Sequence, residues 1–96
     1  MIVIIDGTKI RSERDLHEIL MHELKFGDFY GHNSAALWDR LTTDVERSVK
    51  IVWEHSEQSR VALGNEMFSK YVRLFNDVVE QDALHELDNR LEFMCK

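Results

Sequence analysis

The segment Ile2-Val3-Ile4-Ile5-Asp6-Gly7 places four consecutive β-branched residues before a turn-forming Asp-Gly pair. Such a run is typical of a strand that is covered on both faces, as strands of parallel sheets are. Val49-Lys50-Ile51-Val52-Trp53 forms a second apolar run, and residues 90–94 form a third in which apolar and polar side chains alternate. This alternation predicts an edge strand with one solvated face.

Helical patterns separate the three predicted strands. Apolar residues recur every three or four positions between residues 16 and 24 and again between residues 68 and 79. Asn33 can cap a helix over residues 34–43, and a short helix from Ser56 stops at Gly64, directly before a long helix that opens at Asn65. Strands that alternate with helices predict an α/β fold, with a three-stranded parallel sheet packed with about four helices, mainly over one face. We expect a single domain over residues 1–96.

The composition narrows the range of partners. The chain carries 12 Lys and Arg against 18 Asp and Glu, a formal net charge of −6, which disfavours nucleic acids and favours a basic partner. The longest apolar run, Met1–Ile5, is too short for a membrane span or a signal peptide. A single cysteine, Cys95, excludes an internal disulfide. We therefore expect a cytoplasmic protein that is monomeric when free, with no membrane or nucleic-acid partner.

Motifs for metals, cofactors and catalysis are missing from the sequence. The histidines form no H-E-x-x-H motif, and no C-x-x-C is present. The glycines form neither a dinucleotide-binding motif nor a P-loop, and no serine lies in G-x-S-x-G. We therefore predict no metal, no cofactor and no catalytic residue. The enzymatic alternative is a small hydrolase that uses Asp77, Glu80 and His85, which lie near one another in the sequence.

The helix predicted over residues 34–43 has two different faces. Leu37 and Leu41 lie about 40° apart around the helix axis and point to the core, whereas Asp39 lies about 200° from Leu37 and points to solvent. Small side chains and one aromatic border this carboxylate: Ala35, Thr42 and Trp38. A partner can approach such a surface closely. An ordinary amphipathic helix with a half-buried tryptophan fits the same spacing, so the hypothesis requires Asp39 to stay exposed and unpaired, above all with Arg40.

At this segment the sequence resembles the family of barstar, the intracellular inhibitor of the secreted ribonuclease barnase. The matching motif is Tyr30-Gly31-x-Asn33 followed by Ala36-Leu37-Trp38-Asp39-x-Leu41-Thr42. Further matches are Gly7, Ile10-Arg11-Ser12, Asp15-Leu16-His17, Glu23-Leu24, Trp53 and Glu57-Gln58-Ser59. The resemblance continues into the long helix after one insertion and is weak at the C-terminal end.

The resemblance implies a barstar-like fold and binding to a small basic ribonuclease or ribonuclease-like toxin. In such inhibitors the second helix and the loop before it plug the active site, which is cationic because it must hold phosphodiesters. Asp39 matches the central acid of the family and would occupy a phosphate position. The other partner-binding positions that the resemblance assigns are Phe29 and Trp38 for apolar contact, Gly31, Asn33 and Thr42 for close approach or hydrogen bonds, and Asp44, Glu46 and Asp77 for attraction of a cationic partner. Ala35 lies on the same surface, at the position where the family has a second acid of the binding helix.

Several departures from the family pattern change the charge of this surface. Ala35 and His32 stand in place of acids, Asp44 in place of a tryptophan, Phe29 in place of a tyrosine and Ser48 in place of a proline. We therefore predict a stoichiometric, noncatalytic inhibitor or immunity protein whose target differs from barnase. The alternative is a noncatalytic interaction or regulatory module that keeps the scaffold and binds a different partner.

Overall fold

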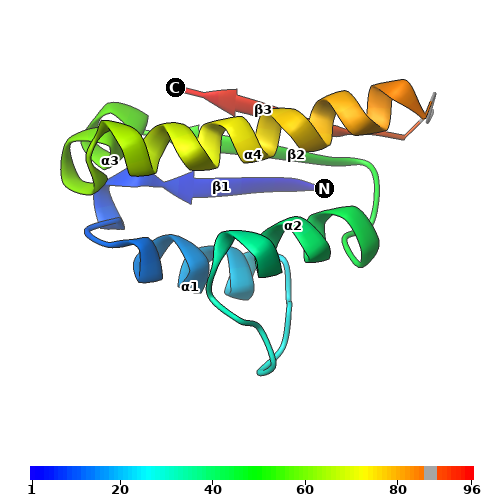
Figure 1. The fold of residues 1–96 in the computed structure, drawn as a ribbon, viewed down its shortest axis with the longest axis horizontal. Coiled ribbons are helices and arrows are strands. Elements are labelled where there is room, and N and C mark those ends of the chain that lie inside the picture. The colour runs from blue at the N-terminus through cyan, green and yellow to red at the C-terminus, as the bar shows by residue number, and fades with distance from the viewer. Residues whose placement is uncertain (86–88) are drawn as a thin grey trace.

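The computed structural model describes residues 1–85 and 89–96, and its elements follow the order expected from the sequence (Figure 1). The strands are β1 (Ile2–Asp6), β2 (Val49–Glu54) and β3 (Leu91–Cys95). A 3₁₀ turn, η1 (Gly7–Lys9), follows β1. The α-helices are α1 (Glu13–Glu23), α2 (Ser34–Thr43), α3 (Ser56–Leu63) and α4 (Asn65–Leu84).

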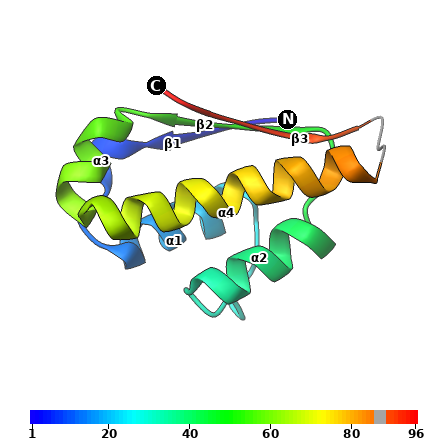
Figure 2. The ribbon, with the colours of Figure 1, turned by 45° about the horizontal axis from the view of Figure 1, so that its top comes forward.

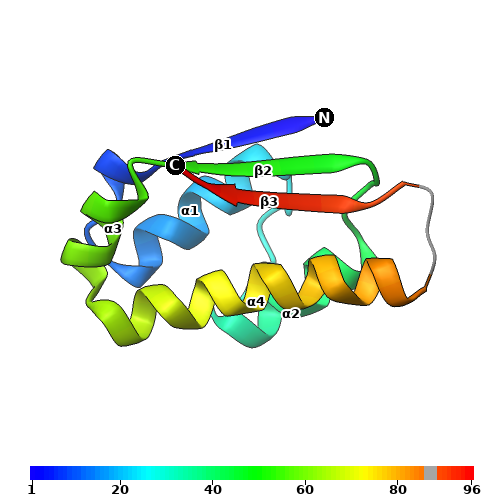
Figure 3. The same ribbon diagram turned by 90° about the horizontal axis from the view of Figure 1, so that it is seen from above.

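The three strands form one parallel sheet in the order β1-β2-β3, which confirms the predicted α/β fold (Figure 3). Val3 pairs with Ile51, and Val49 pairs with Leu91. Helices α1, α2 and α4 lie on the same side of the sheet (Figure 2). None of the described helices combines the length and the apolar composition that crossing a bilayer requires.

One face of the sheet makes the core and the other stays open, which corrects the expectation that β1 is covered on both faces. Val3 and Ile5 are buried beneath the helices. Ile2 and Ile4, which point the opposite way, are 67% and 43% exposed. The β-branched run suits the strand backbone, but the helices cover only the face that carries Val3 and Ile5.

A buried hydrogen-bond chain explains why three of the motif residues noted above belong together. The Trp53 indole N–H donates to Ser59 Oγ at 2.9 Å, and the Ser59 hydroxyl donates to the Gly7 carbonyl at 3.0 Å. A Cβ at Gly7 would lie 2.4 Å from the Glu54 carbonyl oxygen, so only glycine fits this close approach. The chain therefore joins η1, β2 and α3 while satisfying the polar atom of a fully buried tryptophan.

Helix α2 begins where its capping residue predicts. Asn33 Oδ1 accepts a hydrogen bond from the Ala36 N–H at 2.8 Å, which satisfies one of the free donors of the first turn. Leu37 and Leu41 are fully buried, and α2 packs against α4. The inward stripe thus fixes which face of the helix is left for solvent.

A buried ion pair fastens the C-terminal end of α2 to the rest of the fold. The Arg47 guanidinium donates to both carboxylate oxygens of Asp82, at 2.7 and 3.0 Å, and also to the Leu41 carbonyl at 2.9 Å. Asp82 Oδ2 also accepts from the Leu91 N–H at 2.8 Å. Burial alone would raise the pKa of Asp82, but these hydrogen bonds and the Arg47 charge hold it below its usual range. One ion pair therefore connects α2, α4 and β3.

We predict that Asp82→Asn lowers the free energy of unfolding by about 3 kcal/mol or more, because it leaves the Arg47 charge buried beside a neutral amide. Urea unfolding at neutral pH measures the loss. Glu80→Gln, the same isosteric change at an exposed position on α4, is the matched control and should change stability by less than about 0.5 kcal/mol. Equal effects of the two substitutions would contradict this role for the ion pair.

Candidate functional site

Asp39 occupies the centre of the solvent-facing side of α2. The residue is exposed, and its carboxylate makes no ion pair with any described residue. Arg40, the cation that could have neutralised it, instead pairs with Asp44 at 3.2 Å. The condition set by the sequence hypothesis is therefore met, since the Asp39 charge is held on a rigid helix and faces solvent.

The hydroxyls beside Asp39 are turned back onto the helix. Thr42 Oγ1 donates to the Trp38 carbonyl at 2.8 Å, and Thr43 Oγ1 donates to the Asp39 carbonyl at 2.6 Å. These bonds use the hydroxyl hydrogens, so Thr42 offers a partner its oxygen as an acceptor. Ala35 is exposed on the same face and adds no charge. The carboxylate is thus the one charged group among small neighbours.

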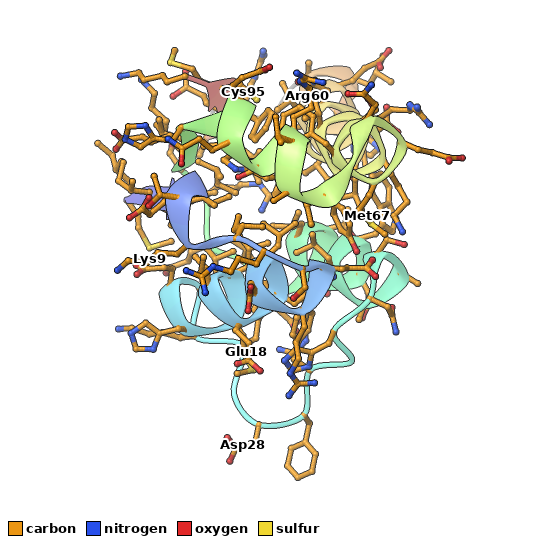
Figure 4. All side chains as sticks on the ribbon, turned by 90° about the vertical axis from the view of Figure 1, so that its left-hand side faces the viewer. Lys9, Glu18, Asp28, Arg60, Met67 and Cys95 are labelled. Atoms are coloured by element: carbon orange, nitrogen blue, oxygen red, sulfur yellow. The ribbon has the colours of Figure 1, made fainter. Side chains whose placement is uncertain are left out.

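The loop before α2 projects beyond the helices, with Asp28 at its outer tip (Figure 4). Phe29 is 96% exposed. Gly31 is exposed, and a Cβ there would lie 3.2 Å from the Ala36 Cβ. Asn33 Nδ2 donates to the Gly31 carbonyl at 3.2 Å while its Oδ1 caps α2, so this amide fixes the loop to the helix.

Behind the loop, a hydrogen-bond network reaches into the core. His17 Nδ1 lies 2.5 Å from the Tyr30 hydroxyl, and His17 Nε2 lies 2.7 Å from the Tyr71 hydroxyl. The Tyr71 hydroxyl donates to the Glu13 carboxylate, which can only accept, so the Tyr71 oxygen must accept from a proton on His17 Nε2. His17 Nδ1 is then the acceptor for the Tyr30 hydroxyl. The network therefore assigns a neutral His17 with its proton on Nε2.

Protonation of His17 would break this arrangement. The histidine is fully buried, and burial lowers its pKa to about 4, opposed by Glu13 and aided by His32 and Lys70. An added proton on Nδ1 would also face the Tyr30 hydroxyl as a second donor. Since Tyr30 lies between Phe29 and Gly31, the order of the exposed loop depends on a neutral imidazole in the core.

Trp38 forms the border between α2 and α4. Its indole is half-buried, and Trp38 lines a shallow hollow together with Ala35 and Asp77. Lys70 and Arg73 line the same hollow, so this part of the surface is less acidic than the region around Asp39. The structure therefore brings α4 alongside α2 and places Asp77 near the predicted helix surface.

Two further predicted acids lie at the far end of α2. Asp44 is the C-cap residue of α2, and its charge is offset by Arg40. Glu46 is exposed, and the described residues give it no ion pair. Of these two carboxylates, Glu46 is therefore the one free to attract a cation at long range.

The residues of the hydrolase alternative also share a hollow. Asp77, Glu80 and His85 line it together with Trp38, Gln81 and Leu84. No hydroxyl, thiol or amine side chain is among the residues that line this hollow. Within residues 1–85 and 89–96, no three His, Cys, Asp or Glu side chains are grouped so that they could hold a metal ion.

Tertiary packing creates parts of the site that local sequence patterns do not reveal. The central role of His17 had one available signal, because it lies within about 60° of both Leu20 and Leu24 on the α1 apolar stripe. The contact between Arg40 and the Phe29 carbonyl joins residues 11 apart and has no signature in the local spacing. The Arg47–Asp82 pair spans 35 residues.

The fold and this surface define a small α/β protein that presents an exposed carboxylate on α2 beside a projecting loop. The family model described as Barstar (barnase inhibitor) matches residues 1–95. The chain is 34% identical over 96 residues to a Bacillus subtilis (strain 168) protein named "Putative ribonuclease inhibitor YrdF", covering 98% of this chain and 97% of the other. The chain belongs to the barstar family, as its motifs indicated.

The low pKa of His17 predicts an acid-sensitive fold. Because the unfolded state binds a proton at about the usual pKa of 6.5 and the folded state at about 4, stability is complete above pH 6.5 and falls between those values by up to about 3 kcal/mol. Urea unfolding at a series of pH values should show that the free energy of unfolding of His17→Gln depends less on pH than that of the parent protein. His22→Gln, at an exposed site on the same helix, should keep the pH dependence of the parent protein. A His17 ring that protonates near pH 6.5 by NMR would contradict the assignment.

Proposed function

We propose that this protein is a stoichiometric inhibitor of a small basic ribonuclease, which it blocks by inserting α2 and the preceding loop into the active site. The observation that carries the proposal is the exposed, unpaired Asp39 carboxylate on the outer face of α2 in a chain of the barstar family. The relative named as a ribonuclease inhibitor supports the same class of partner.

The chemistry follows from what a ribonuclease active site must contain. Arg, Lys and protonated His side chains hold the phosphodiester there, and a carboxylate can form the same charge-assisted hydrogen bonds as a phosphate oxygen. Asp39 is exposed, and the buried Leu37 and Leu41 hold its helix in one orientation. The carboxylate therefore occupies a phosphate position without reorganisation of the inhibitor.

The surrounding residues have distinct roles in this proposal. Phe29 and Trp38 supply apolar contact, and the exposed Gly31 allows close approach of the partner backbone. Asn33 orders the loop, and Thr42 offers an acceptor beside Asp39. The absence of an acid at Ala35 leaves the α2–α4 border with Lys70 and Arg73, so the favoured target has a less cationic site there than one that reads a second acid.

The biological setting that fits is protection of the cell that makes or meets the ribonuclease. An inhibitor present in the cytoplasm would neutralise the enzyme before its secretion or on its arrival as a toxin. The inhibitor would act as a monomer in a one-to-one complex. No chemical step is required, because occupation of the active site suffices.

We expect Asp39→Asn to raise the Kd at least about 100-fold, roughly 3 kcal/mol, mainly through faster dissociation, because the cationic site would lose its counter-charge while the helix keeps its shape. Inhibition of RNA cleavage is titrated with barnase and a panel of other small basic microbial ribonucleases. The control is Glu92→Gln, the same loss of charge on the open face of the sheet.

The outcomes separate the proposed function from its alternative. Inhibition that is complete at a one-to-one ratio and lost with Asp39→Asn supports active-site blockade. No inhibition of any panel member at tenfold molar excess overturns the proposal and favours a module with a different partner. Equal inhibition by Asp39→Asn and Glu92→Gln would remove Asp39 from the interface.

The association rate constant should fall steeply with salt. A net charge of −6 and the exposed Glu46 and Asp77 attract a cationic partner over distances that dissolved ions screen. Between about 0.05 and 0.5 M NaCl we expect association to slow by on the order of tenfold, while dissociation changes little. Stopped-flow fluorescence measures both rates. A flat salt profile would contradict electrostatic steering.

A further inference from the structure

Arg40 connects α2 to the projecting loop through three contacts. One guanidinium nitrogen, Nη2, donates to the Phe29 carbonyl at 3.3 Å, and the other, Nη1, pairs with the Asp44 carboxylate at 3.2 Å. The guanidinium also lies 5.5 Å from the centre of the Phe26 ring. The side chain is 24% exposed, so it is largely enclosed between the helix and the loop.

Phe29 cannot hold its own position. With 96% of its surface exposed, the ring has almost no contact with the rest of the protein. Its backbone is held instead, on one side by the bond from Arg40 and on the other by Tyr30, which is buried and bonded to His17. Phe26, at the start of the loop, is buried beneath Arg40. The exposed aromatic therefore stands between anchored neighbours.

We propose that Arg40 is a positioning residue of the recognition surface, which fixes Phe29 in its binding-ready place without itself having to touch the partner. That Phe29 meets a ribonuclease rests on the proposed function, whereas the ordering of the loop does not. An aromatic contact that is already ordered avoids the loss of conformational freedom that a mobile loop would undergo on binding.

Because Arg40 is positively charged, the direction in which affinity changes when it is removed tests this role. A cation on an acidic surface opposes a cationic partner, so its removal should strengthen binding if charge alone mattered. A positioning role predicts the reverse, since removal frees Phe29. The Asp44 carboxylate, which pairs with Arg40, offsets its positive charge. The guanidinium can therefore hold the loop with only a small repulsion of a cationic partner.

The first test uses the free protein. Arg40→Met keeps an unbranched apolar side chain and removes the guanidinium with its three contacts, and Arg40→Lys keeps the charge but cannot bond the Phe29 carbonyl and Asp44 together in the same geometry. The control is Arg60→Met on α3, where Arg60 pairs with Glu57 within its helix. Figure 4 shows Arg60 and Asp28 at opposite ends of the molecule.

Backbone ¹⁵N relaxation gives the readout. Both Arg40 variants should lower the order parameters of Asp28 and Phe29, while amide protection in α2 stays at the parent level. Arg60→Met should leave the loop unchanged. A loop that stays fully ordered in both Arg40 variants overturns the proposal, and this result does not depend on any ribonuclease.

The second test is a double-mutant cycle with the ribonuclease of the panel that the parent protein inhibits most strongly. Arg40→Met should speed dissociation by on the order of tenfold, and Phe29→Ala should cost less affinity in that background than in the parent, because the two residues act together. Additive effects, or tighter binding by Arg40→Met, would overturn the positioning role. If the parent protein inhibits no ribonuclease of the panel, that result counts against the proposed function, and the relaxation measurement alone decides the role of Arg40.

Discussion

The ion pair between Arg47 and Asp82 holds the end of α2, which carries the proposed binding surface, against the rest of the fold. It brings together the end of α2, the last turns of α4 and the first residue of β3, three segments that chain connectivity leaves apart. A solvent-exposed salt bridge contributes little to stability, but both of these side chains are largely enclosed. The guanidinium nitrogen that does not contact Asp82, Nη1 of Arg47, donates to the Val45 carbonyl. Contacts on the inner side of α2 therefore fix its orientation, and the residues on its outer face are not needed for this packing.

The surface that results is built from side chains held in different ways. Asp39 projects from a helix whose inner leucines are locked in the core, so its direction comes from regular secondary structure. Phe29 projects from a loop, and its direction comes from polar contacts made by its neighbours, Tyr30 to His17 and Arg40 to the Phe29 carbonyl. The position of Asp39 therefore depends little on any single contact. The position of Phe29 depends on the protonation state of His17 and on the side chains of Tyr30 and Arg40.

The sequence predicted the sheet, its order of elements and the limits of α2, because strand runs, a capping asparagine and a leucine stripe are local signals. It also placed Asp39 outward, since helical geometry alone decides that. It could not predict Arg47–Asp82, His17 between two tyrosines, or Arg40 against the loop, because these join residues that only folding brings together. The open face around Ile2 and Ile4 was mispredicted since β-branched residues favour strands whether or not a second layer covers them.

The open face of the sheet affects the tendency of the protein to associate with itself at high concentration. Ile2 and Ile4 on β1 and Met94 on β3 are exposed apolar residues on the open face of the sheet. Both strands are edge strands, and the free backbone groups of an edge strand can pair with a strand of another molecule. Lys50 and Glu92 lie among them as charged gatekeepers that make stacking of two such faces unfavourable. The exposed apolar residues of the sheet and the face of α2 that we propose binds a partner thus lie on opposite sides of the molecule, so solubility and partner choice can be altered separately.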